Sequence, residues 1–253
     1  MSSATAAAAP RAASRLRMPA GGLVFAGTLV AVGLGAQWLG LLDGILARWD
    51  DITYLSVEHM QLVVISGGLA IATGLPLGMV LSRPWARRAA EPVMQLLNIG
   101  TTVPTLAVLA LAMTVLGIGN PPAIFALWVM TLLPIVRNTV VGLHEVPRHL
   151  IEAANGMGMT ARQMLWRVEL PNALYVILAG IRTALAINVG TVPLAFLIGG
   201  GGLGELIFTG IDLAEPTMML AGAIPTALLA VATDFTIALI TRLIVSRGVL
   251  PQD

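Results

Sequence analysis

The chain has 253 residues, of which 57% are hydrophobic and 11% are charged, against roughly 25% charged residues in a soluble domain. This composition predicts an integral membrane protein, and the net charge of +1 gives no indication of nucleic-acid binding. The chain has no cysteine, which excludes a disulfide framework and a thiolate site. It also has no lysine, and all 14 of its basic residues are arginine. Because a Walker A loop needs a lysine to reach the nucleotide phosphates, the chain does not bind ATP in that way.

Six apolar stretches are long enough to cross a bilayer, which takes about 20 residues in a helix. In chain order they are residues 20–42, 60–82, 93–118, 121–143, 173–198 and 217–245. Residues 1–19 are rich in Ala, Ser and Arg, and we expect them to form a disordered cytoplasmic tail. A cleaved signal peptide made of this tail and the first stretch is the alternative, although no convincing small-residue cleavage site precedes the polar segment.

The distribution of arginine predicts the orientation of these spans, because cytoplasmic loops carry an excess of positive residues. With the N-terminus inside the cell, every arginine that flanks a span falls on the cytoplasmic side except Arg48. The opposite side collects acidic residues, namely Asp43, Asp50, Asp51, Glu58, Glu205, Asp212 and Glu215. We therefore expect both termini in the cytoplasm.

The loop between the fourth and fifth predicted spans is unusually polar for this chain. Its sequence predicts a first helix over residues 148–156, which the glycines at 156 and 158 end. Thr160 and Gln163 form a capping-box pattern that predicts a second helix running to about residue 169. A helix, a turn and a helix at the membrane surface is a shape suited to docking a partner.

The same loop carries a spaced motif: Glu152, Ala153 and Ala154, then Gly158, then Val168, and finally Leu170 and Pro171. This pattern resembles the EAA loop of binding-protein-dependent ABC importer permeases, with Val168 in place of isoleucine as the one departure. The small residues allow a helix to approach a partner's backbone closely, and Glu152 can pair with a partner's arginine. An ordinary amphipathic loop is the alternative interpretation.

The segments "LPIVRNTVVGL", "LWRVELPNALYVILAGIRTA" and "LIGGGGLGELIFTGI" extend the resemblance to permeases that import osmoprotectants such as glycine betaine, carnitine and choline. The similar region covers about residues 57–245. The resemblance implies an all-α integral membrane protein of about six helices with the ABC type I importer (MetI-like) fold, and a permease domain at 56–245. It also implies the partners: two ATPase subunits that bind ATP and Mg²⁺, a second permease subunit (the same chain or a paralogue) and an extracytoplasmic solute-binding protein. No cofactor is expected on this chain itself.

Three charges lie inside the predicted spans, and an isolated charge facing lipid is unfavourable. Counted at about 1.5 Å per residue from the cytoplasmic ends, Arg182, Asp234 and Arg137 lie about 10 to 15 Å deep. These similar depths predict that Arg182 and Asp234 meet between the last two spans, with Arg137 nearer the inner mouth. The pair either lines the solute pathway as a gate or is a purely structural ion pair.

Other polar positions in the spans complete the candidate pathway. The third predicted span contains Asn98, Thr101, Thr102 and Pro104, where proline opens the helix backbone, so these residues line the pathway or pack between helices. Asn138 and Asn188 are further candidates. Gly200 and Gly201, within the run 199–202, form either a mobile outer loop that gates the pathway or a simple flexible turn.

An aromatic cage is the usual way to bind a quaternary ammonium group, but the 12 aromatic residues of this chain are dispersed. We therefore expect solute recognition to belong to the binding protein and this chain to provide a low-affinity path. The three histidines are scattered, so no metal site is expected. The alternatives are a permease for another small solute such as an amino acid, and, more distantly, an intramembrane enzyme. A secondary transporter is a further alternative, although no inverted repeat is visible.

Overall fold

The computed structural model describes residues 41–245, and these residues are helical with connecting turns. The predicted tail 1–19, nearly all of the predicted first span 20–42 and the C-terminal residues 246–253 lie outside the described residues. The chain divides into two compact units, residues 1–43 and 44–253. Helix α2 (Leu41–Leu46) contains the boundary, and the fold described below is that of the second unit.

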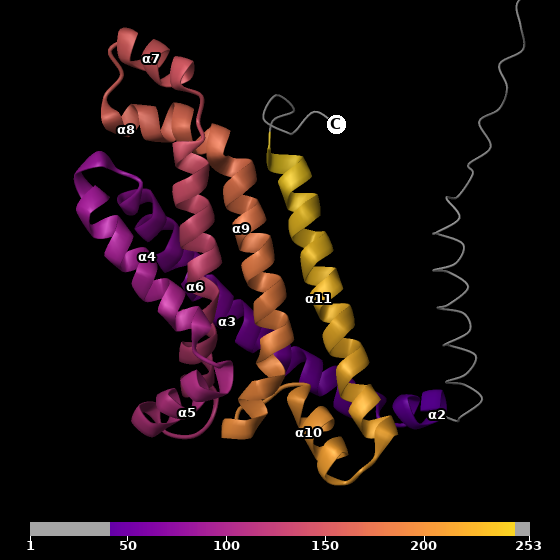
Figure 1. The fold of residues 1–253 in the computed structure, drawn as a ribbon. Helices are drawn as coiled ribbons and strands as arrows, with labels where there is room; N and C mark the ends of the chain where they lie inside the picture. Colours follow the sequence, from indigo (N-terminus) through magenta and orange to yellow (C-terminus); the bar gives the residue numbers. More distant parts are fainter. Residues whose placement is uncertain (1–40, 246–253) are drawn as a thin grey trace, which may run out of the picture. The chain divides into compact units, whose positions relative to one another are not determined.

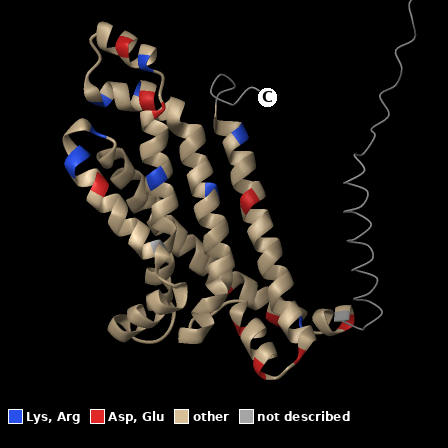
Figure 2. Ribbon diagram, viewed as in Figure 1, with Lys and Arg blue, Asp and Glu red and all other residues tan. Residues whose placement is uncertain are grey.

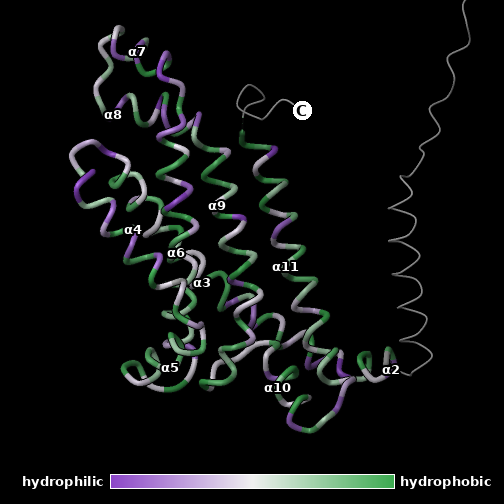
Figure 3. The backbone as a smooth tube through the Cα atoms, in the orientation of Figure 1, coloured by the Kyte–Doolittle hydropathy of each residue, from purple (hydrophilic) through white to green (hydrophobic). Residues whose placement is uncertain are grey.

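Four helical segments are long and apolar enough to cross a membrane (Figures 1 and 3). They are α3 (Trp49–Leu81), α6 (Asn120–His144), α9 (Leu170–Thr191) with its continuations, and α11 (Pro216–Ile244). The predicted spans at 60–82, 121–143, 173–198 and 217–245 are therefore confirmed as helices. Helix α3 begins at Trp49 instead of residue 60, and acidic Asp50 and Asp51 in its first turn favour that start because they complement the helix dipole.

The predicted third span, residues 93–118, is broken at Pro104, the position where the sequence predicts an opened helix backbone. The structure divides it into α4 (Arg87–Thr102) and α5 (Thr105–Leu116), which meet at 97°. Val103 has an extended backbone and Pro104 is the N-terminal cap of α5, so the helix ends at the residue before proline, where steric contact with the proline ring disfavours helical backbone. The bent pair is either one broken span or a re-entrant segment, and the described residues contain four or five spans accordingly.

Shorter elements connect these helices. They are η1 (Pro84–Ala86), α7 (Arg148–Gly156), α8 (Ala161–Met164), η2 (Leu165–Glu169), η3 (Val192–Ile198) and α10 (Gly204–Asp212). Helices α7 and α8 project together from one end of the long helices, which we call the loop end, and α10 lies at the opposite end (Figure 1).

Helices α3, α6 and α9 form the packed centre of the unit, and glycine makes their close approach possible. A Cβ atom on Gly78 of α3 would lie 2.6 Å from Cβ of Thr139 in α6, and a Cβ atom on Gly180 of α9 would lie 2.9 Å from the carbonyl oxygen of Pro134 in α6. No larger residue fits at either place without moving a backbone. The core is therefore built on backbone proximity, as is usual where helices associate without a hydrophobic driving force between them.

Arginine is concentrated at one end of the unit, whereas acidic residues occur at both (Figure 2). Arginines gather at the loop end on α4, α7, α8 and the adjoining parts of the long helices, where acidic residues are interspersed, whereas the charges around α10 are mostly acidic. At the α10 end, Arg48 donates a hydrogen bond of 2.6 Å from Nη2 to Oε1 of Glu215. Arg48 is the one flanking arginine that the sequence places on the side opposite the cytoplasm. Its bond to Glu215 accounts for an arginine at the α10 end.

Candidate coupling loop and pathway residues

The loop between α6 and α9 folds as two short helices, as the sequence predicts. Helix α7 ends at Gly156, and the turn passes through Gly158, whose φ of +73° is readily adopted only by glycine. The predicted capping box is present: the Thr160 amide donates to Oε1 of Gln163 at 2.9 Å, and the Gln163 amide donates to Oγ1 of Thr160 at 3.3 Å. These paired bonds fix the start of α8.

The motif residues present an open surface on this loop. Glu152 and Ala153 are exposed, whereas Ala154 is 1% exposed and lies on the buried side of α7, which packs against η2. Within residues 41–245, Glu152 forms no ion pair, and an added Cβ on Gly158 would meet nothing within 4 Å. Leu170 is half-buried and Pro171 occupies the first turn of α9. The loop therefore offers a free carboxylate and a bare turn to a partner while its buried side holds it to the bundle.

Arg182 of α9 and Asp234 of α11 form the ion pair that their depths predict. Arg182 Nε and Nη2 donate to the two carboxylate oxygens of Asp234, the Nη2 bond measuring 2.5 Å. The side chains are 46% and 38% exposed, so the pair lies on an open face of the chain. Arg137 of α6 is exposed and takes no part in an ion pair within the described part of the chain.

The remaining polar candidates have different surroundings. Asn138 donates to the carbonyl oxygen of Pro134 at 2.8 Å and faces Gly180 across the α6–α9 contact. Asn98 is exposed on α4, Thr102 Oγ1 donates to the Ile99 carbonyl oxygen at 2.8 Å, and Pro104 caps α5. Thr101 is described only through its backbone, in the last turn of α4. These residues gather at the corner between α4 and α5 and do not line a straight helix.

Asn188 belongs to a buried polar cluster that the sequence analysis did not assemble. Its Nδ2 donates to Ser66 Oγ of α3 at 2.9 Å and to Thr131 Oγ1 of α6 at 2.8 Å, and all three residues are at most 1% exposed. About two turns before Ser66 on α3, the fully buried His59 donates from Nε2 to the carbonyl oxygen of Val189, the residue after Asn188, at 3.0 Å. Asn188 therefore joins three helices and does not reach the open surface of the chain. Small polar residues spaced along the predicted spans were the only sequence signal for this cluster.

The glycine run 199–202 is held against α3 and α6. The Gly201 amide donates to Asn120 Oδ1 at 3.0 Å and the Gly202 amide donates to Glu58 Oε2 at 3.3 Å. Gly199 and Gly202 have φ values of +79° and +102°, whereas Gly200 is buried with an ordinary backbone. A cavity of about 490 Å³ opens beside the run, lined by Glu58, Asn120, Phe196, Gly199, Gly200, Gly201 and Glu205.

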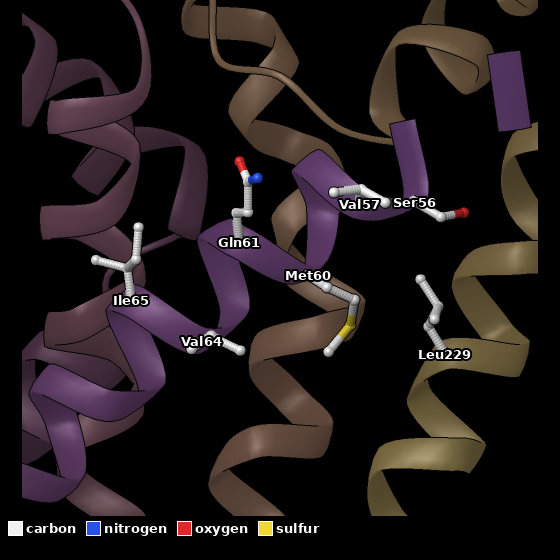
Figure 4. A pocket seen from close by; sticks show the side chains of 7 residues that line it. All are labelled: Ser56, Val57, Met60, Gln61, Val64, Ile65 and Leu229. Carbon is white, nitrogen blue, oxygen red and sulfur yellow. The ribbon is translucent and has the colours of Figure 1, made fainter. Parts of the chain in front are cut away.

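A second, mostly apolar cavity of about 540 Å³ lies along α3 and reaches Leu229 of α11 (Figure 4). Met60 and Ser56 lie on the side of α3 toward Leu229, whereas Gln61 points away from it. This part of the chain therefore offers an apolar surface and no set of polar groups for holding a solute.

Comparison with known proteins decides the family. Residues 70–246 match the family described as "Binding-protein-dependent transport system inner membrane component". The chain belongs to this family. It is accordingly a multi-pass inner membrane protein, a permease subunit and not an enzyme, and it works with an ATPase and a solute-binding protein.

Individual relatives agree with the family. The chain is 55% identical over 197 residues to the osmoprotectant import permease protein OsmY of Salmonella typhimurium, covering 78% of this chain and 84% of that protein. It is 39% identical over 198 residues to the choline transport system permease protein OpuBB of Bacillus subtilis, covering 78% and 90%. Among solved structures, an inward-facing MetNI methionine ABC transporter chain is 26% identical with a TM-score of 0.69, covering 78% of this chain and 99% of that one. The predicted MetI-like all-α fold is confirmed, whereas the count of six spans is not, because four or five are described.

Proposed function

We propose that the chain is the permease of an ATP-driven importer for a small osmoprotectant of the quaternary-amine type, such as glycine betaine, choline or carnitine. The observation that carries this proposal is the 55% identity to an osmoprotectant import permease over 78% of the chain. Further relatives at 39% to 41% identity are named for choline, carnitine and glycine betaine transport. The assignment of the solute depends on the similarity to these relatives, since no aromatic cage lines the cavities of the described residues.

We further propose that the loop end faces the cytoplasm, with both termini on that side. The concentration of arginine at this end supports the orientation, because positive residues favour the cytoplasmic side. Two ATPase subunits, which bind the ATP and Mg²⁺, dock on the α7–α8 loops of two permease subunits, either two copies of this chain or this chain and a paralogue. The exposed Glu152 and the bare turn at Gly158 supply the docking surface.

Transport then follows an alternating-access cycle. Approach of the two ATPase subunits displaces the docked loops, and the displacement passes to the helices that are continuous with them, α6 and α9. Loaded binding protein and ATP favour different conformations, so binding at the two sides of the membrane shifts the population between them. The binding protein delivers its solute at the α10 end, where Glu205, Asp212 and Glu215 lie, and the Arg182–Asp234 pair lies on the face that we assign to the pathway.

Uptake of radiolabelled glycine betaine tests this proposal, in a strain that lacks its own uptake systems and expresses this chain with its ATPase and binding protein. We expect ATP-dependent uptake by the intact system and its loss in Glu152→Lys and Gly158→Trp, which place a charge and a bulky ring on the docking surface. Glu145→Lys, another exposed acidic position at the loop end, is the matched control that should retain uptake. Uptake that survives both loop substitutions would overturn the docking role.

An amino-acid solute is the second candidate, and the similarity to the methionine transporter chain supports it. Competition separates the two: excess unlabelled choline or carnitine should reduce betaine uptake, whereas excess methionine should not. Uptake of labelled methionine without uptake of betaine would assign the chain to the second candidate.

A further inference from the structure

A salt bridge at the loop end joins the docking loop to a helix that the chain does not connect to it directly. Arg83, two residues beyond the end of α3, donates from Nη2 to Oε2 of Glu169 at 2.5 Å. Glu169 is the last residue of η2, immediately before α9. Of the ion pairs within residues 41–245, this is the one that ties the loop to another helix. The EAA pattern leaves position 169 variable, so the motif itself gives Glu169 no role.

The arginine is held in place on its own side before it meets the carboxylate. Its Nε donates to the Met79 carbonyl oxygen at 3.3 Å, and Nε and Nη2 donate to Ser82 Oγ at 3.2 and 3.1 Å. The Arg83 and Glu169 side chains are 21% and 12% exposed. Fully exposed ion pairs contribute little because water screens them and their side chains are mobile. A partly buried, charge-assisted bond between oriented groups is stronger and more directional.

The same turn also receives α6. His144, the last residue of α6, donates from Nε2 to the Ser82 carbonyl oxygen at 3.1 Å. Three segments therefore meet around Ser82 and Arg83: the end of α3, the end of α6 where the loop leaves, and the start of α9 where it returns. The η2 segment is a π-helix, a form that recurs at functional sites and rotates the residues that follow it relative to a regular α-helix.

We propose that Arg83 and Glu169 are positioning residues that transmit movement of the docked loop to α3 and to the α4 corner beyond it. Helices α6 and α9 receive that movement through the backbone, since the loop is continuous with both. Helix α3 has no such continuity with the returning side of the loop, and the ion pair supplies the connection. This inference rests on the proposed function of the loop as the docking site of an ATPase.

Reconstitution of the whole complex in vesicles tests this role of Arg83 and Glu169. ATP is supplied on the side of the membrane that carries the ATPase, and loaded binding protein on the opposite side. The measured quantity is solute transported per ATP hydrolysed, together with co-purification of the ATPase. In Arg83→Gln and Glu169→Gln we expect ATPase binding and hydrolysis to continue while transport per ATP falls at least about fivefold, the lower end of typical coupling factors. In the exchanged pair Arg83→Glu with Glu169→Arg, the solute transported per ATP should recover at least about half of the difference between the neutral variants and the unaltered protein.

Two controls make each outcome decisive. Arg87→Gln removes an exposed neighbouring arginine that has no ion pair within the described residues, and it should leave the ratio unchanged. Glu152→Lys should instead abolish ATPase co-purification, so that failure of the docking proposal shows itself separately from failure of this one. An unchanged ratio in both neutral variants would overturn the proposal, as would an exchanged pair no better than either Arg83→Glu or Glu169→Arg alone. If a neutral variant does not accumulate in the membrane, Arg83→Lys and Glu169→Asp are measured in its place. We expect the same fall in solute transported per ATP, and an unchanged ratio in both would likewise overturn the proposal.

Discussion

The side chains of Arg182 and Asp234 form an ion pair that joins α9 to α11. No residue in the most apolar 18-residue stretch of α11 is buried, and the helix packs mainly against α9 and α10. A charge left alone in a membrane span is unfavourable unless water or a partner reaches it. We therefore expect the pair to hold α11 to α9, on a face where both side chains are partly exposed.

Reversing the charges tests that attachment. We expect Arg182→Asp and Asp234→Arg each to reduce membrane accumulation and uptake to less than about half, because each puts two like charges together in a span. The double exchange should recover most of both quantities. Immunoblotting of the membrane fraction and solute uptake provide the measurements, and a double exchange no better than the single ones would show that the pairing is not what matters.

The glycine contact between α6 and α9 makes a stability prediction. In Gly180→Leu the new side chain would run into Asn138 and the Pro134 carbonyl oxygen, and overpacking of this kind costs about 1–3 kcal/mol. The thermal unfolding midpoint of the detergent-purified protein should fall by several degrees. Gly190→Leu is the matched control on the same helix, since an added Cβ there meets nothing within 4 Å. Equal midpoints for the two variants would contradict the close approach.

The buried cluster around Asn188 predicts a smaller loss of unfolding free energy. Asn188→Ala removes the amide that links Ser66 to Thr131, although both hydroxyl groups keep bonds to carbonyl oxygens of their own helices. Interhelical hydrogen bonds in membranes contribute about 0.6 kcal/mol on average, so we expect a loss of about 1 kcal/mol once the lost packing is included. Thr183→Ala, an exposed position on the same helix, should change the unfolding midpoint by less.

The glycine run at the α10 end makes a functional prediction. Gly202→Val is strained by its φ of +102°, and its Cβ would lie 3.3 Å from the Cα atom of His59. We expect uptake to fall severalfold because the segment that borders the 490 Å³ cavity must shift. Gly68→Val, on a face of α3 with nothing within 4 Å, should retain uptake. Full uptake by Gly202→Val would show that the placement of this run does not limit transport.

The long helices and the two short helices of the loop between α6 and α9 could be predicted because their signals are local. Apolar stretches of span length, the Thr160–Gln163 capping box and the spaced EAA residues each lie within a few turns of sequence. The Arg182–Asp234 pair was also predictable, although the residues are 52 positions apart, because unfavourable charges at similar depth have few partners.

The features that the sequence did not predict depend on geometry between helices. Pro104 predicts a break in the stretch 93–118, but neither its sequence nor its composition records the angle, so the 97° corner between α4 and α5 was not predicted. The contacts of Asn188 with Ser66, and of Arg83 with Glu169, join positions 122 and 86 residues apart. Which helix faces bring such positions together is decided by packing of the whole unit, which no local pattern records.

The glycine contacts between α3, α6 and α9 have a mechanical consequence. Because Gly78 and Gly180 already bring neighbouring backbones into contact, α6 cannot move closer to α3 or to α9, and movement at the loop end is confined to sliding and tilting along these contacts. Helix α3, with 33 residues, is about 50 Å long at 1.5 Å per residue. A tilt of about 5° at the loop end then carries the far end of the helix through about 4 Å, enough to move its contacts with the glycine run by more than the width of a carbon atom.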